Sequence, residues 1–351
     1  NVNNLIVQNA YVFILATGML FCILTGGNID LSVGSVVCFV GAVGGKMMVT
    51  NGMNPYLTMV VMLLVGLLIG AWQGFWIAYV RIPPFIVTLA GMLVFRGLSN
   101  VVLEGMTLAP MPDNFLALFN NYVPDFFGME GFNMTCFLVG VIVCVLYVFM
   151  VLKGRAARTK KGYRVEPFGG VLIKMIVICA AVLAFMFRLA QYKGIPNSLV
   201  WIVLVIAVYT YIASKTTVGR YFYAVGGNEK ATKLSGINTN RVYFLAYLNM
   251  GFLAAVAGMI TTARLNSANP TAGTNFEMDA IGACFIGGAS AYGGTGTVPG
   301  VIIGALLMGV LNLGMSIMGV DQNMQKVVKG LVLLAAVIFD VVSKRKSFIV
   351  K

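Results

Sequence analysis

Apolar runs of about 20 residues recur along the chain, each followed by a short polar segment. A helix of that length crosses the hydrocarbon core of a bilayer. The pattern predicts an all-α polytopic membrane protein with about 10–12 transmembrane helices, some of them broken, in a single transmembrane domain over residues 1–351. The predicted spans are 5–25, 33–50, 56–80, 85–103, 133–152, 171–190, 198–214, 242–263, 279–290, 299–319 and 326–342.

One interruption of this pattern is GGASAYGGTGTVPG, residues 287–300. Its glycines include Gly287, Gly288, Gly293 and Gly294. Together with Pro299 they exclude a continuous helix. Irregular backbone at membrane depth must be covered by protein or must line a water-filled cavity. The segment is therefore either a break beside a pathway through the membrane or its cytoplasmic gate, or a plain surface loop.

A second interruption, LTGGNIDLSVGS at residues 24–35, places a carboxylate in an apolar part of the chain. An ionised Asp at the bilayer centre costs roughly 2.5–3.5 kcal/mol. The cost falls if Gly26 and Gly27 break the helix and Asp30 or Ser32 caps the next one, where free N–H groups favour an oxygen. Capping is the favoured interpretation, with direct ligand contact or proton handling by Asp30 as alternatives.

Charged residues are rare and unevenly placed, since the chain is 59% hydrophobic and 10% charged with a net charge of +13. A soluble domain carries about 25% charged residues. The basic excess is therefore interpreted as a topology signal and not as a nucleic-acid surface. Lys and Arg collect in 153–169, in 215–241 and in the C-terminal tail, which predicts that these segments are cytoplasmic.

The segment 104–132 carries acidic residues and no Lys or Arg, which predicts a periplasmic loop. With a cytoplasmic C-terminus, the predicted spans place Asn1 outside the cell. An additional span upstream of Asn1 is therefore expected.

Motifs for catalysis are missing from the sequence. The chain has no His, and its six Cys lie in apolar runs without a CxxC pair, so a metal site is not indicated. GAVGGKMM, residues 41–48, resembles a phosphate-binding loop but has Met47 where Ser or Thr would hold magnesium. We predict no catalytic residue, no metal site and no cofactor in this chain, and an enzyme is the weakest of the possible functions.

The cytoplasmic loop 215–241 contains a predicted short helix at 228–235. Asn228 is a good N-cap residue and Gly236 a good C-terminal stop. Glu229 lies in the first turn, where the helix dipole favours negative charge, and is spaced to pair with Lys233. Such a helix is too short to be stable alone in water.

Two roles fit this helix equally well on physical grounds. It is either a capped connector on the membrane surface or a docking helix that a partner stabilises. In the second case Ala231, Leu234 and Ile237 are the apolar side chains offered to a groove.

Three segments of the chain closely resemble those of a known family: GGNIDLSVGS, GRYFYAVGGNEKATKLSGI and IGACFIGGASAYGGTGTVPGVIIGALLMGVLNLGM. They are similar to the permease subunits of bacterial sugar ABC importers, in the ribose, galactose and xylose branch. The resemblance covers almost the whole chain. A basic loop and an extra apolar stretch at 153–197 make the chain most similar to the xylose or multiple-monosaccharide branch.

The resemblance implies a homodimeric permease of the bacterial cytoplasmic (inner) membrane that moves a pentose or hexose by alternating access. A pair of cytoplasmic ATPase subunits, which bind ATP and Mg, would dock below it, and a periplasmic sugar-binding protein would deliver the sugar. The segment 228–236 matches the family's coupling helix. Glu229 and Lys233 would orient it, while Ala231 and Leu234 would be buried in the ATPase. The basic residues of 153–164 would attract anionic lipid, with a regulatory or ATPase contact as the alternative.

A monosaccharide needs a wet path with hydrogen-bonding walls. Polar residues within the predicted spans that could line it are Gln8, Asn9, Thr17, Asn249 and Asn312, although hydrogen bonds between helices explain each as well. The competing hypothesis is an ion-coupled secondary transporter, which would need ionisable residues inside the membrane. Only Asp30 and Arg96 are expected to provide them.

Overall fold

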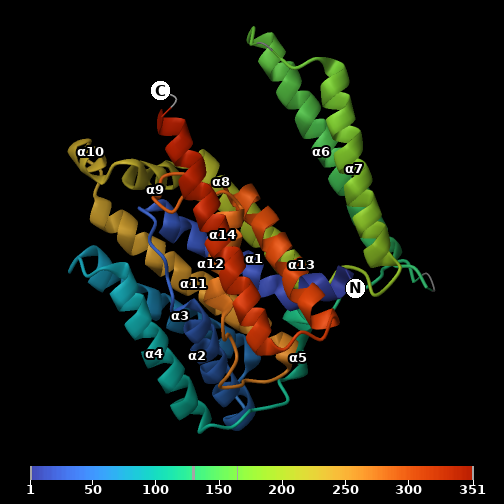
Figure 1. The fold of residues 1–351 in the computed structure, drawn as a ribbon. Coiled ribbons are helices and arrows are strands. Elements are labelled where there is room, and N and C mark those ends of the chain that lie inside the picture. The colour runs from blue at the N-terminus through green and yellow to red at the C-terminus, as the bar shows by residue number, and fades with distance from the viewer. Residues whose placement is uncertain (1, 129–130, 164, 350–351) are drawn as a thin grey trace. The chain divides into compact units, whose positions relative to one another are not determined.

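A computed structural model describes residues 2–128, 131–163 and 165–349, and helices dominate these segments (Figure 1). The helices are α1 (Val2–Leu24), α2 (Val33–Gly45), α3 (Pro55–Ala78), α4 (Pro84–Leu103), α5 (Asp113–Phe119), α6 (Met134–Lys160), α7 (Phe168–Ala190), α8 (Asn197–Lys215), α9 (Thr217–Gly227), α10 (Glu229–Leu234), α11 (Thr239–Leu265), α12 (Phe276–Ile286), α13 (Val298–Ile317) and α14 (Gln322–Ile349). A π-helical turn, Lys46–Thr50, extends α2. The remaining residues, 1, 129, 130, 164, 350 and 351, lie outside the described segments and include parts of the predicted loops 104–132 and 153–169.

Within the described residues, nine helices are long and apolar enough to cross a membrane. The prediction of an all-α polytopic membrane protein is confirmed, and a helix is present in every predicted span. Two helices that lie in predicted spans, α12 and α14, are not among these nine. The 11 residues of α12 rise only roughly 16 Å, so it cannot cross the bilayer alone. The helices α5 and α9 were not predicted, because both are short and lie in polar loops.

The chain divides into two compact units. The hairpin unit contains Asn121–Asn197 together with the first four residues, and in it α6 and α7 pack against each other. The core unit contains Leu5–Asn120 and Ser198–Lys351. Within the most apolar window of each helix, only 17% of α6 and 11% of α7 is buried, against 89% of α1 and 72% of α11. The hairpin helices therefore expose apolar side chains of the kind that face lipid.

The helix α11 packs closely against α3 in the core unit. Three glycines of α3, Gly66, Gly70 and Gly74, lie four residues apart and face α11. A Cβ at Gly66 would lie 2.5 Å from the carbonyl oxygen of Gly251, so the two backbones touch. Small residues at this spacing allow helices to approach closely in a membrane, where dispersion contacts and not the hydrophobic effect drive association.

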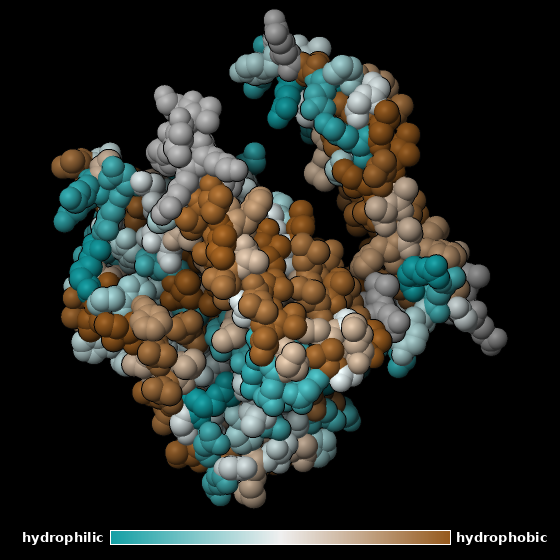
Figure 2. Space-filling view, viewed as in Figure 1, coloured by the Kyte–Doolittle hydropathy of each residue, from teal (hydrophilic) through white to brown (hydrophobic). Residues whose placement is uncertain are grey.

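The surface of the core unit shows the corresponding pattern (Figure 2). Hydrophobic residues, drawn in brown, gather over α13 and α14. Hydrophilic residues, drawn in teal, gather near α10 and at the opposite end, below the brown band. This is the distribution expected of a unit with a lipid-facing belt between two wet ends.

Candidate functional site

The helix α10 begins and ends where the sequence predicts. The side chain of Asn228 accepts a hydrogen bond from the backbone N–H of Ala231 at 3.0 Å, which is the expected N-cap. Gly236 follows the helix in a left-handed conformation with φ of 83°. The hydroxyl of Thr232 donates to the carbonyl oxygen of Ala224 at 2.8 Å and ties α10 back to α9.

The outer face of α10 presents apolar side chains. Leu234 is 89% exposed and Ala231 is also exposed, whereas Thr232 is buried against α9. Because the side chain of Leu234 buries almost no apolar surface, it contributes almost nothing to the stability of the fold. The face is therefore available to a partner.

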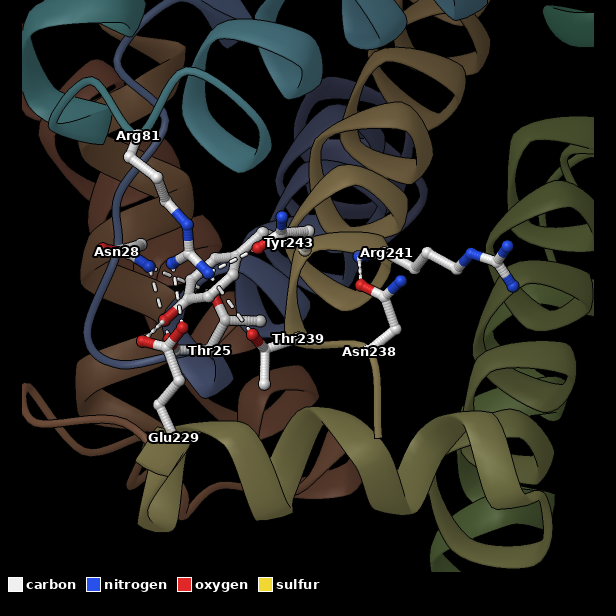
Figure 3. A network of polar contacts seen from close by, with 9 residues as sticks. Thr25, Asn28, Arg81, Glu229, Asn238, Thr239, Arg241 and Tyr243 are labelled. Carbon is white, nitrogen blue, oxygen red and sulfur yellow. Dashed lines mark hydrogen bonds and ion pairs between the residues drawn. The ribbon is translucent and has the colours of Figure 1, made fainter. Parts of the chain in front are cut away.

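Glu229 connects α10 to the turn between α3 and α4 (Figure 3). Its carboxylate lies 2.8 Å from the guanidinium of Arg81 and accepts a hydrogen bond from the hydroxyl of Tyr243 at 3.1 Å. Partial burial acts to raise the pKa of Glu229, but the hydrogen bond and charge of Arg81 outweigh it and lower that pKa below its ordinary value of 4.5. The predicted pair with Lys233 is not formed among the described residues, because Arg81 takes the carboxylate from across the fold.

Three glycine-rich turns meet close to the start of α10. These are the end of α1 at Leu24–Gly27, the end of α9 at Gly226 and Gly227, and the turn at Gly293 and Gly294. The backbone N–H of Gly294 donates to the carbonyl oxygen of Leu24 at 3.0 Å. A Cβ at Gly226 would lie 1.7 Å from that same oxygen, and a Cβ at Gly27 would lie 1.9 Å from the carbonyl oxygen of Ala291. The three segments recognised in the sequence are thus in backbone contact with one another, and we call this contact the glycine junction.

Asp30 is 2% exposed and lies in the irregular segment before α2. Its carboxylate accepts from the backbone N–H of Ser32 at 2.8 Å and from the Ser32 hydroxyl at 2.6 Å. That hydroxyl accepts from the side-chain amide of Gln73 at 2.7 Å. The predicted cap is wrong in its geometry, because Ser32 is the N-cap residue of α2 and its side chain bonds no N–H of the first turn. Asp30 instead fixes the approach to α2 and joins it to α3.

The predicted break at 287–300 is confirmed, since α12 ends at Ile286 and α13 begins at Val298. Gly287 lies against the start of α13, where a Cβ would be 2.5 Å from the carbonyl oxygen of Gly300. Gly288 has a φ of 85°, which reverses the chain. The intervening Ser290 is 2% exposed, so this segment is partly buried in the core unit.

A polar cavity of about 690 Å³ lies at the opposite end of α11 from α10. The rise of α11 from Thr239 to Arg264 is roughly 38 Å, about the thickness of a membrane. Of the predicted path residues, Gln8, Asn9 and Asn312 line this cavity. Thr17 and Asn249 are not among its lining residues. Thr17 donates to the carbonyl oxygen of Phe13, and Asn249 accepts from Tyr209.

The cavity wall contains an ion pair that the sequence analysis missed. Lys329 lies 2.8 Å from the carboxylate of Asp279, and their side chains are 12% and 1% exposed. Tyr11 donates to the same carboxylate at 2.6 Å. The expectation that only Asp30 and Arg96 provide such ionisable groups within the predicted spans is therefore wrong, since Asp279 and Lys329 lie in the predicted spans 279–290 and 326–342. Arg96 donates to the carbonyl oxygens of Pro270 and Ala272. The sequence does contain a signal for this pair, because an acidic residue in one predicted span and a basic residue in another can pair with each other.

Comparison with known proteins adds a second line of evidence. Residues 1–337 match the family described as "Branched-chain amino acid transport system / permease component". The chain is 39% identical to the xylose transport system permease protein of Escherichia coli (strain K12) over 347 residues, which are 99% of this chain and 86% of that protein. It is 37% identical to the xylose transport system permease protein of Haemophilus influenzae over 346 residues, 99% of this chain and 90% of the relative.

The chain is also 35% identical to the ribose import permease protein of Escherichia coli (strain K12) over 341 residues, 97% of this chain and 85% of that protein. No solved structure matches the chain. The matches run across both compact units and all three segments of the glycine junction.

Proposed function

The chain belongs to this family of membrane permease components, which are not enzymes, and on that premise we propose that it imports a monosaccharide across the bacterial cytoplasmic membrane. In this proposal it is the membrane-spanning subunit of an ATP-driven importer. Two copies form the pathway, and a separate cytoplasmic ATPase binds ATP and Mg. A periplasmic binding protein delivers a pentose or hexose to the opposite side.

The observation that carries the proposal is the exposed apolar face of α10. This element is a capped helix with an unpartnered leucine, held in place by Arg81 and Glu229 at one end of α11. A docked ATPase would bury Ala231 and Leu234 and thereby stabilise a helix too short to persist alone. In this proposal α10 and the C-terminus lie on the cytoplasmic side, and the basic residues of 215–241 support that orientation.

The glycine junction supplies a physical route from the ATPase to the pathway. Two residues, Gly227 and Asn228, separate Gly226 from α10, and Gly226 touches both Leu24 and Gly294. Because these contacts are between backbones, a displacement of α10 cannot be absorbed by side-chain rotation. Movement of the docked ATPase would therefore reach the end of α1 and the break between α12 and α13 together.

The test is co-purification of the full importer with its ATPase, followed by binding-protein-dependent sugar uptake in proteoliposomes. Leu234→Asp should leave the permease in the membrane, reduce ATPase recovery at least tenfold and abolish uptake. The control is Met106→Asp, which also replaces an exposed apolar side chain by Asp but lies in the segment 104–132 and is 56% exposed. Equal ATPase recovery from the Leu234→Asp variant and the wild type would refute docking at α10.

A second candidate function, ion-coupled secondary transport, is favoured by the buried pair of Asp279 and Lys329. It predicts sugar uptake by this subunit alone when a proton or sodium gradient is imposed. The ATP-driven proposal predicts no uptake under those conditions and full uptake once ATPase, ATP and binding protein are added.

A further inference from the structure

The polar cavity at the far end of α11 has features of a ligand site. Its volume of about 690 Å³ is within the range of pockets that hold small molecules. The walls come from α1, α11, α12, α13 and α14 and from the loop between α11 and α12, so no single element forms it. All of the lining residues belong to the core unit.

The side-chain amide of Asn312 is incompletely hydrogen-bonded within the protein. Its side-chain oxygen is buried and has no hydrogen-bond partner among the described residues. Its side-chain N–H groups make two long contacts, 3.3 Å to the oxygen of Asn9 and 3.3 Å to the carboxylate of Asp279. A buried carbonyl without a partner costs about 1–3 kcal/mol. That oxygen is enclosed by protein, so a ligand hydroxyl would remove the cost once the amide of Asn312 turns toward the cavity that the residue lines.

Among the described residues, four charged side chains line the cavity, namely those of Arg264, Asp279, Lys326 and Lys329. Asp279 is paired with Lys329 at 2.8 Å and hydrogen-bonded to Tyr11 at 2.6 Å, so the pair presents no net charge to a ligand. Beside it the rings of Tyr11 and Phe276 stack with centroids 3.5 Å apart. The side-chain amides, the N–H donors of Arg264 and Lys326 and the aromatic surface together can bind a hydroxyl-rich molecule, whose hydroxyls both donate and accept hydrogen bonds.

We propose that this cavity is a monosaccharide-binding subsite of the permease, in which Asn312 accepts and donates hydrogen bonds with the sugar hydroxyls and Asn9 assists it. The inference rests on the proposed import function and deepens it by assigning a binding site for the sugar within the permease itself. Asp279 and Lys329 form the wall and hold α12 to α14. The sugar would occupy this site after delivery and before passage.

Direct binding tests the subsite without the other subunits. Saturation-transfer NMR with D-xylose and with D-ribose on the purified full chain should give a signal for at least one sugar. Asn312→Leu should reduce that signal at least fivefold. Asn312→Ser, which keeps a small polar side chain but removes the amide, should also reduce it. The control is Asn323→Leu, an amide at the same end of the molecule that does not line the cavity.

The thermal midpoint of each variant is measured alongside, so that loss of the fold is separated from loss of binding. Loss of signal in a folded Asn312→Ser variant, with Asn323→Leu unchanged, supports the subsite. An unchanged signal in both Asn312 variants, or no signal from the wild type, overturns it. Failure of the proposed function is a different result, namely no monosaccharide uptake by the complete wild-type importer.

Discussion

One ion pair lies near each end of α11, and the two pairs differ in burial. At the cavity end the side chains of Lys329 and Asp279 are 12% and 1% exposed. At the α10 end those of Arg81 and Glu229 are 43% and 36% exposed. Removing one partner of a buried pair costs about 3–5 kcal/mol because a charge is left without compensation, whereas an exposed pair is worth about 0–1 kcal/mol.

Because the two pairs differ in burial, one stabilises the fold and the other mainly orients a helix. The cavity pair holds α12 and α14 together, and its loss threatens the fold. The α10 pair contributes little to the free energy of unfolding but sets where a docking helix lies. Substitutions at the two ends should therefore be distinguished by their readouts, one in stability and the other in coupling to a partner.

The largest effect is expected from Asp279→Leu. It leaves the Lys329 ammonium nearly buried without its partner and should lower the free energy of unfolding by about 3–5 kcal/mol. The measurement is the thermal midpoint of the detergent-purified protein. Adding Lys329→Met to the same variant should recover more than half of the loss, because the unpaired charge is gone. If the double variant is as unstable as Asp279→Leu alone, the buried charge is not the cause.

A smaller effect is expected at the glycine junction. Gly226→Ala places a methyl group 1.7 Å from the carbonyl oxygen of Leu24, and forcing the turns apart should cost about 1–3 kcal/mol. It should also uncouple ATP hydrolysis from sugar uptake in the assembled importer. Gly227→Ala is the control, because its methyl group meets nothing within 4 Å. Similar behaviour of the two variants would show that the contact at Gly226 has no special role.

The smallest effect on stability is expected from Glu229→Gln, below about 1 kcal/mol at neutral pH. The folded state lowers the pKa of Glu229 below 4.5, so its contribution is present above that pH and is lost as the pH falls through the lower folded value. The difference in thermal midpoint between wild type and Glu229→Gln should therefore vanish under acid conditions. A difference that grows as the pH falls below 4.5 would contradict the assigned pair.

The features that could be predicted from the sequence, the ends of α10 and the break after α12, depend on residues close together in the chain. The bounds of α10 followed from Asn228 and Gly236, because caps act within three or four residues of the chain. The break after α12 followed from glycines and Pro299 for the same reason. The partner of Glu229 could not be predicted from local signals, because Lys233 is near in sequence whereas Arg81 is 148 residues away.

The sequence by itself determined the membrane-spanning helices, the breaks in them and the capped helix α10, because each depends on hydrophobicity and hydrogen bonding along a short stretch of chain. Only the tertiary structure decided which breaks touch and which charges pair. The contact of Tyr11 with Asp279 spans 268 residues, and the contact of Gly294 with Leu24 joins opposite parts of the chain. Such contacts depend on how helices pack in space, and no local pattern of residues contains that information.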